Sequence, residues 1–220
     1  MPTILDLRQG QRTTLQDAET GAAFDNALLI PYGVIIENGR TGSENDILSG
    51  NETRNFLFGN AGSDELIGRG GNDVLHGGDG ADTYVWNLGD GRDTIIDVDD
   101  NLIANPLRRT ELDRLEISVA TGELDLLEED IIFRRLGNTL RLDLRLDGRS
   151  AQGSIVIQDF NLDSNQIESL ALFGPSGDGT ITQIGEDIDL VSIWEAATPL
   201  AQSFQVTADD GNFGLIAVPV

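Results

Sequence analysis

A nine-residue repeat in the middle of the chain constrains the fold more than any other feature. Five consecutive blocks fill residues 41–85, and a sixth, residues 88–96, follows a shift of two residues at Trp86 and Asn87. The sixth position of the blocks is Asp or Asn: Asp46, Asn55, Asp64, Asp73, Asp82 and Asp93. The eighth position is apolar or aromatic: Leu48, Leu57, Leu66, Leu75, Tyr84 and Ile95. A short fixed period predicts that every block folds as the same unit and stacks on its neighbours.

Within each block the residues predict a turn followed by a short strand. Glycine at the fourth position allows backbone conformations that other residues resist, and the last four blocks have it: Gly62, Gly71, Gly80 and Gly91. The eighth position has the period-two pattern of a strand with one inward face. We expect each block to form a turn of about six residues and a strand of about three, with two blocks closing one coil of a parallel β-roll.

Coils that stack at strand spacing, roughly 4.8 Å, place each turn beside the turn two blocks later. One edge of the roll then stacks Asp46, Asp64 and Asp82, and the other stacks Asn55, Asp73 and Asp93. Carboxylates about 5 Å apart repel by roughly 3 kcal/mol per pair at an effective dielectric constant near 20. A calcium ion between turns reverses this interaction, because calcium binds about six to eight oxygens from carboxylates and backbone carbonyls. The repeat therefore predicts several bound calcium ions.

The composition excludes several other classes of function. The 220 residues include 14 arginines, no lysine and 38 acidic residues, for a formal net charge of −24. Phosphate recognition needs clustered cations, so a nucleic-acid partner is disfavoured, and so is an anionic membrane surface. No apolar run approaches the roughly 18 residues of a membrane span. Cysteine is absent, and the one histidine, His76, cannot supply the two histidines of an H-E-x-x-H zinc site.

The repeats resemble the RTX (repeats-in-toxin) or haemolysin-type calcium-binding β-roll. Residues 34–60 are similar to the start of such rolls in serralysin-type secreted metalloproteases, and residues 89–97 to their usual end. The resemblance covers roughly residues 32–175, and its later matches are Asp113–Leu115, Asp130-Ile131, Gly153–Ile155, Ile157–Phe160 and Gln166–Glu168. The chain departs from the family pattern at the fourth position of the first two blocks, where Glu44 and Thr53 replace glycine, and at Asn55.

The resemblance implies a non-catalytic module that folds on calcium binding outside the cell. It also implies a type I secretion exporter in a Gram-negative-type bacterium, with an uncleaved export signal at the C-terminus. Residues 1–14 lack the apolar segment of a Sec signal peptide, which agrees with that route. The implied calcium ligands are Gly42, Asp46, Asn55, Asn60, Gly62, Asp64, Gly71, Asp73, Gly78, Gly80, Asp82, Gly89, Gly91, Asp93, Asp97 and Asp99. Asp79 and Asp90 are expected to point to solvent.

After the repeats the pattern changes to that of an antiparallel sheet that caps the roll. Leucine alternates with charged residues over residues 140–147, after a hairpin turn at Gly137-Asn138, and predicts a half-buried strand. Residues 155–157 and 167–173 predict further strands, and residues 189–197 a short helix. We therefore expect an all-β fold with an N-terminal segment (1–31), a β-roll (32–100), an antiparallel capping region (101–200) and a tail with the export signal (201–220).

Two other functions stay open at this stage. The repeats are compatible with an adhesin, a matrix protein or a polysaccharide-binding module, although aromatic residues make up only 5% of the chain. The chain could also be a fragment of a secreted hydrolase whose catalytic domain is missing. The sequence leaves the oligomeric state open.

Overall fold

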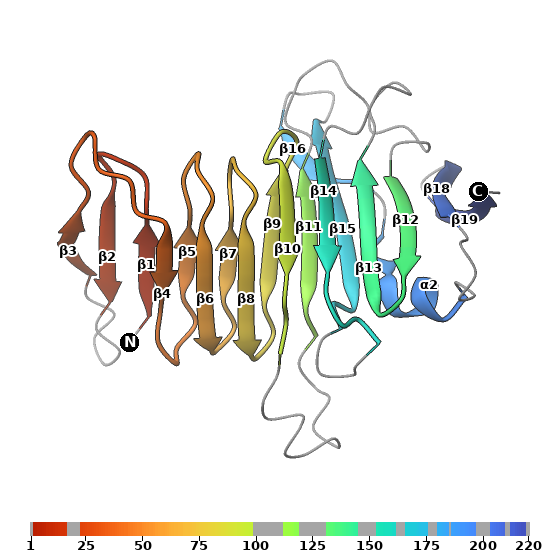
Figure 1. The fold of residues 1–220 in the computed structure, drawn as a ribbon, viewed down its shortest axis with the longest axis horizontal. Helices are drawn as coiled ribbons and strands as arrows, with labels where there is room; N and C mark the ends of the chain where they lie inside the picture. Colours follow the sequence, from red (N-terminus) through yellow and green to blue (C-terminus); the bar gives the residue numbers. More distant parts are fainter. Residues whose placement is uncertain are drawn as a thin grey trace.

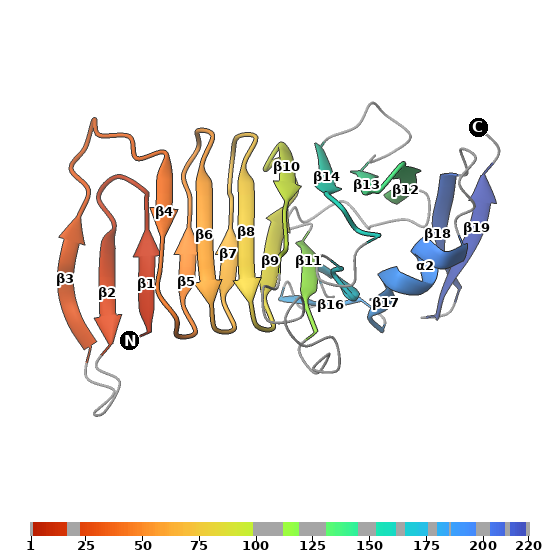
Figure 2. The ribbon, with the colours of Figure 1, turned by 60° about the horizontal axis from the view of Figure 1, so that its bottom comes forward.

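The computed structural model describes residues 2–16, 23–98, 112–118, 131–144, 153–161, 166–175, 180–184, 186–196, 203–209 and 212–218. In this part the chain alternates between two β-sheets whose strands stack along the long axis of the molecule (Figure 1). Successive repeats add one strand to each sheet in turn, and tight turns at both edges connect the sheets (Figure 2). The predicted all-β fold, a parallel roll with a capping sheet, is confirmed.

The first sheet, sheet A, has ten strands. Its central strands pair in parallel, from the N-terminal end of the roll to the C-terminal end: β1 (Thr3–Asp6), β5 (Ile47–Ser49), β7 (Glu65–Ile67), β9 (Thr83–Asn87), β11 (Arg114–Ser118) and β15 (Ser169–Pro175). The strands at its two ends pair antiparallel: β2 (Arg12–Gln16), β3 (Ala23–Leu29), β16 (Ile181–Gln183) and β17 (Ile188–Asp189).

The second sheet, sheet B, has nine strands. Five of them pair in parallel: β4 (Asn38–Arg40), β6 (Phe56–Ala61), β8 (Val74–Asp79), β10 (Arg92–Ile95) and β14 (Gly153–Ile157). The others pair antiparallel and extend the sheet beyond the roll: β13 (Thr139–Leu144), β12 (Ile131–Leu136), β18 (Ser203–Asp209) and β19 (Asn212–Val218).

The register of the strands follows the nine-residue period. Leu48 lies opposite Leu66, and Leu66 opposite Tyr84, along sheet A, while Leu57 lies opposite Leu75 along sheet B. All six eighth-position side chains are at most 2% exposed. Each turn therefore lies beside the turn two blocks later, as the period predicts, and the eighth positions form the core of the roll.

The roll continues past the repeats on the C-terminal side. Strands β11 and β14 pair in parallel with the last repeat strands of their sheets, β9 and β10. The strands expected at 155–157 and 167–173 form as β14 and β15. Each pairs in parallel with a strand of the roll on one side and antiparallel with a strand of the capping region on the other. Their buried residues, such as Ile157 and Leu170, align with the apolar core positions of the repeats, so parallel stacking continues the same core.

The antiparallel cap is the β12–β13 hairpin and its neighbours. The hairpin turns at the expected residues, with Gly137 at φ 63°. Helix α2 (Leu190–Ala196) confirms the short helix predicted for residues 189–197. Its side chains of Leu190, Ile193 and Trp194 are buried. In the described residues no helix has the length and apolar character needed to cross a membrane.

Candidate metal centre

The sixth-position side chains form a ladder of hydrogen bonds along each edge of the roll. On the first edge, the backbone N–H of Asp46 donates to Oδ1 of Asp64 at 2.7 Å, and that of Asp64 donates to Oδ1 of Asp82 at 2.8 Å. On the second edge, the N–H groups of Asn55 and Asp73 donate to Asp73 and Asp93 at 2.7 and 2.9 Å. Each aspartate is thus held by the backbone of the preceding coil.

The second oxygen of three of these aspartates has no such partner. Oδ2 of Asp64, Asp73 and Asp82 is buried and accepts no hydrogen bond from the described residues. Burial raises the pKa of these carboxyls to about 6, about 7 and about 8, and that of Asp93 to about 8, because the charged form loses its water. A buried carboxylate oxygen without a donor is expected to have a cation as its partner.

The glycines of the turns bring further oxygens to the same place. A Cβ atom added to Gly59 would overlap Oδ2 of Asp64 and approach the carbonyl oxygen of Gly77, so only glycine fits there. Gly78 and Gly80 pack in the same close way against the carbonyls of Asn60 and Gly62 in the preceding coil. The available donors are carboxylate and carbonyl oxygens, which is the set that calcium prefers. These turns therefore fit calcium.

The backbone of these turns is left-handed at two places. The second position has a positive φ in four blocks, at Asn60, Arg69, Gly78 and Gly89. The fourth position has it in the same blocks, at Gly62, Gly71, Gly80 and Gly91. Left-handed residues at these two positions allow the chain to reverse its direction within a short turn.

A family comparison agrees with this geometry. The sequence model of the RTX calcium-binding nonapeptide repeat, in four copies, matches residues 40–75 and 49–84. Residues 40–84 are haemolysin-type RTX calcium-binding repeats. RTX nonapeptide repeats bind Ca²⁺, and domains built from them are generally non-catalytic. No curated protein matches the chain.

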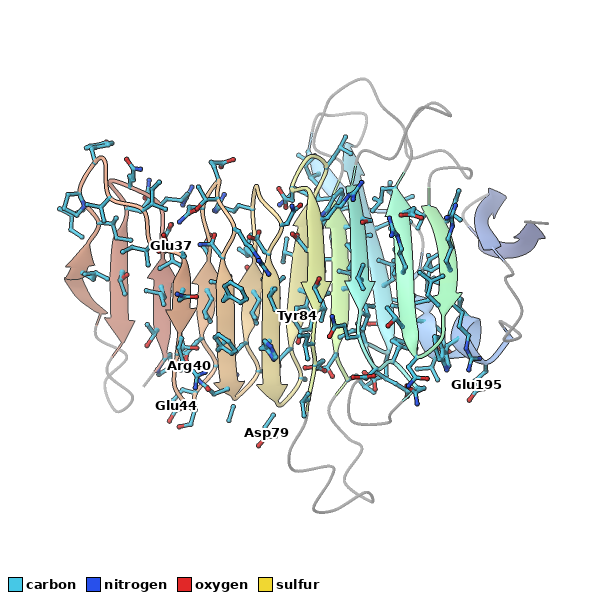
Figure 3. All side chains as sticks on the ribbon, in the orientation of Figure 1. Glu37, Arg40, Glu44, Asp79, Tyr84 and Glu195 are labelled. Atoms are coloured by element: carbon cyan, nitrogen blue, oxygen red, sulfur yellow. The ribbon has the colours of Figure 1, made fainter. Side chains whose placement is uncertain are left out.

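A cluster of three buried carboxylates lies where the RTX repeats end. One carboxylate oxygen from each of Asp82, Asp97 and Asp113 lies within 4.8 Å of the others, and Asp97 is 1% exposed. The Tyr84 hydroxyl, inside the roll (Figure 3), donates to Oδ1 of Asp97 at 2.8 Å and accepts from the N–H of Gly77 at 2.9 Å. Burial, and then the charge of Asp97, raises the pKa of Asp113 far above its usual range. The cluster can hold a cation in the same way as the repeat turns.

Asp97 occupies the position that glycine holds in the preceding coils. Ile95 pairs with Leu75, so Asp97 lies beside Gly77. The nine-residue pattern predicts Asp97 as a ligand but not Asp113, which continues the first edge by accepting the N–H of Asp82 at 2.7 Å. The signal was present, because Asp113 precedes the buried Leu115 by two residues, as Asp82 precedes Tyr84.

The structure places the other predicted ligands as follows. Asp46 and Asn55 lie at the N-terminal end of the two ladders, where Asp46 accepts hydrogen bonds at both oxygens and Asn55 is bonded at both its oxygen and its nitrogen. Gly42 lies in the same N-terminal turn as Asp46, and Asp99 lies outside the described residues. One solvent expectation is wrong, because Oδ2 of Asp90 accepts the N–H of Asn87 at 2.6 Å and closes its own loop.

Proposed function

We propose that this chain is a calcium-binding module in which ion binding and folding form a single equilibrium. The supporting observation is the row of buried Oδ2 atoms of Asp64, Asp73 and Asp82 that accept no hydrogen bond from the described residues. An ionised carboxylate buried without a partner costs several kcal/mol. A roll that buries several of them is expected to form only when cations neutralise them.

The proposed ligands are the carboxylates of the turns and of the cluster at the end of the roll, with backbone carbonyls of the glycine-rich turns. Bound calcium supplies positive charge between adjacent coils. The residues of the chain orient the oxygens, exclude water and hold the coils in register. The carboxylates proposed as ligands are Asp64, Asp73, Asp82, Asp93, Asp97 and Asp113, and Asp99 is a further candidate.

The setting that suits such a module is outside the cell. Extracellular calcium modules bind their ions at roughly 10⁻⁴ to 10⁻³ M, so a chain of this kind stays unfolded where calcium is scarce and folds where it is plentiful. We propose export through a type I exporter, with the signal in residues 201–220 and with the domain limits given above. The net charge of −24 keeps the unfolded chain extended and soluble.

The test is a calcium titration followed by circular dichroism, for the parent chain and for Asp82→Asn. Calcium should produce a cooperative gain of β signal in the parent, and magnesium should replace it poorly because magnesium demands strict octahedral geometry. Asp82→Asn should raise the calcium midpoint about tenfold, the equivalent of about 1.4 kcal/mol. The matched control is Asp79→Asn in the same turn, whose side chain points away from the roll (Figure 3). A parent spectrum that is the same with calcium and with chelator would refute the proposal.

Export is tested separately from calcium binding. Removing residues 213–220 takes away most of β19, the edge strand of sheet B, which does not pair with the strands of the repeats. We expect this truncation to stop export by a type I exporter while the calcium midpoint stays within about twofold of the parent's, because the calcium turns are intact. Continued export of the truncated chain would show that the export signal does not lie in residues 213–220. It would not affect the calcium proposal.

The aromatic residues on the outer face of sheet B do not favour the alternative of polysaccharide binding. Sugars stack on free aromatic ring faces. On the outer face of sheet B, the ring faces of Phe58 are already in contact with other side chains. Phe58 stacks on His76 with a centroid distance of 4.8 Å, and the Arg40 guanidinium lies 4.5 Å from the Phe58 centroid. The calcium module is therefore the function that the described residues support best.

A further inference from the structure

The first two turns of the repeat array are closed by their own backbone. In the turn 41–46, the N–H of Gly42 donates to Oδ2 of Asp46 at 3.1 Å. In the turn 50–55, the N–H of Asn51 donates to Oδ1 of Asn55 at 2.8 Å. In both turns a second-position N–H thus occupies the sixth-position oxygen that Asp64, Asp73 and Asp82 leave without a donor.

The backbone conformation explains this difference. Blocks 59–67, 68–76 and 77–85 have left-handed residues at positions two and four, whereas the positive-φ residues of the described chain include none from 41–46 or 50–55. Glu44 and Thr53 stand at the fourth position of those two turns, where the later blocks have glycine. A side chain at that position disfavours the left-handed conformation. The second-position N–H therefore points into the turn instead of leaving space for an ion.

The remaining polar atoms of the two turns also have partners. Oδ1 of Asp46 accepts the backbone N–H of Thr3 from β1. The Asn55 amide nitrogen donates to the carbonyl of Ile36 at 3.0 Å. On this edge the preceding coil thus presents a carbonyl, where the later coils present an N–H to each aspartate. An amide fits a carbonyl and a carboxylate does not, which accounts for Asn at this position.

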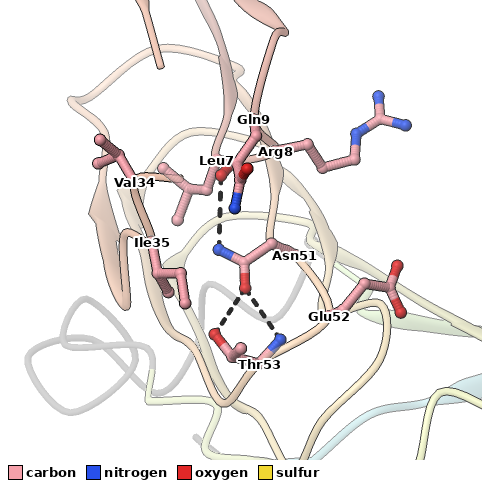
Figure 4. A pocket seen from close by; sticks show the side chains of 8 residues that line it. All are labelled: Leu7, Arg8, Gln9, Val34, Ile35, Asn51, Glu52 and Thr53. Carbon is pink, nitrogen blue, oxygen red and sulfur yellow. Dashed lines mark hydrogen bonds between the residues drawn. The ribbon is translucent and has the colours of Figure 1, made fainter. Parts of the chain in front are cut away.

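The side chain of Asn51 connects the second turn to neighbouring backbone by hydrogen bonds (Figure 4). Its amide nitrogen donates to the carbonyls of Ile36 at 2.7 Å and Leu7 at 3.4 Å, and its Oδ1 accepts the N–H and the hydroxyl of Thr53 at 2.9 and 2.7 Å. The adjoining cavity of about 290 Å³ is lined by apolar residues, including Val34 and Ile35, and by polar ones, including Glu52. Among the described residues, the group of three close carboxylates that could hold an ion lies elsewhere, at Asp82, Asp97 and Asp113.

We propose that the turns 41–46 and 50–55 bind no calcium and that hydrogen bonds of Asp46, Asn51 and Asn55 do there what the ion does in later turns. This inference rests on the proposed calcium sites at Asp64, Asp73 and Asp82. It removes Gly42, Asp46 and Asn55 from the ligands that the family resemblance implies. The calcium sites then begin one coil later on each edge, and the N-terminal coil is a metal-independent end on which the calcium-dependent coils stack.

The decisive experiment counts bound calcium ions by isothermal titration calorimetry in two matched variants. Asp46→Asn and Asp64→Asn make the same chemical change on the same edge, one coil apart. We expect Asp46→Asn to bind as many ions as the parent and Asp64→Asn to bind at least one fewer. Loss of an ion in Asp46→Asn as well would overturn the inference. A full ion count in Asp64→Asn would instead refute the proposed sites, whatever Asp46→Asn shows.

Asn55→Asp gives a second test that does not depend on the folding of Asp46→Asn. Its new carboxylate would face the Ile36 carbonyl, so we expect weaker folding at saturating calcium, no added ion, and a calcium midpoint at or above the parent's. If Asn55 were a ligand, the added charge would tighten calcium binding severalfold. A lower calcium midpoint in Asn55→Asp would therefore overturn the inference. Asp73→Asn makes the reverse change on the same edge, and we expect it to bind at least one ion fewer than the parent.

Discussion

Tyr84 differs from the other eighth-position residues because its core side chain ends in a polar group. The ring fills the same place as Leu66 in the preceding coil, and it is 0% exposed. Its hydroxyl joins Gly77, in the turn of the fifth block, to Asp97 and so links the core of the roll to the carboxylate cluster. At this one coil a tyrosine stands where the preceding coil has a leucine, and its hydroxyl places a hydrogen-bond donor beside the carboxylate cluster.

Tyr84→Phe should destabilise the calcium-bound module by about 1–2 kcal/mol and raise its calcium midpoint. The change removes one hydrogen bond to a carboxylate and leaves the N–H of Gly77 without an acceptor. Thermal unfolding at saturating calcium measures the first effect. Tyr32→Phe is the control, because Tyr32 is 87% exposed. Equal melting temperatures for Tyr84→Phe and the control would show that the hydroxyl contributes nothing.

At the scale of single elements, the first-position glycines decide how closely a turn can pack on its own aspartate. A Cβ atom on Gly77 would overlap Oδ2 of Asp82 and the Tyr84 hydroxyl, and one on Gly68 would come within 2.6 Å of Oδ2 of Asp73. These glycines are required for the space they leave, since neither is among the residues with a positive φ. The nine-residue turn is therefore built around the carboxylate oxygen that it encloses.

Gly77→Ala should destabilise the module by on the order of 2 kcal/mol or more, because the methyl group displaces the carboxylate and fills the space beside it. Gly42→Ala is a matched control from the first turn, where a Cβ meets nothing within 4 Å and the φ is not positive. We expect it to change the stability by less than about 0.5 kcal/mol. Chemical denaturation in calcium compares the two, and similar losses in both would contradict this account of the turn.

At the scale of the whole molecule, the buried acids couple folding to pH as well as to calcium. The pKa values of Asp64, Asp73, Asp82 and Asp93 rise from 3.8 to about 6, 7, 8 and 8 on folding. Folding therefore favours their protonated forms. This contribution to the stability of the metal-free roll is fully present below about pH 3.8 and is lost as the pH rises through the range from about 6 to 8.

Metal-free protein should consequently gain β structure when the pH falls from about 8.5 to about 5.5, without any calcium. Circular dichroism in chelator-treated buffer measures this, and the lower limit stays above the sequence isoelectric point of about 4.1, where low net charge favours aggregation. The calcium midpoint should also rise as the pH falls, because protons compete for the same oxygens. A metal-free spectrum that does not change over this range would show that the buried acids do not limit folding.

Much of this architecture can be predicted from local information. The nine-residue period sets the direction of each side chain, because a turn and a strand of constant length repeat the same φ and ψ angles. The pairing of Asp64 with Asp46 and Asp82, and the burial of Leu57 and Leu75, follow from that period. The hairpin at Gly137 and the helix at residues 190–196 were also predictable from short-range signals.

The sequence by itself determined the roll and its two acidic edges, because both are consequences of one short period. Only the tertiary structure decided where the roll ends. Asp113 joins the edge of Asp82 after an interval of 31 residues, and β14 joins β10 in parallel across the β12–β13 hairpin. Such pairings depend on which apolar strand covers the exposed end of the core, and no spacing along the chain encodes that choice. The direction of the Ile36 carbonyl, which suits an amide rather than an ion, is likewise set by how the first coil is closed.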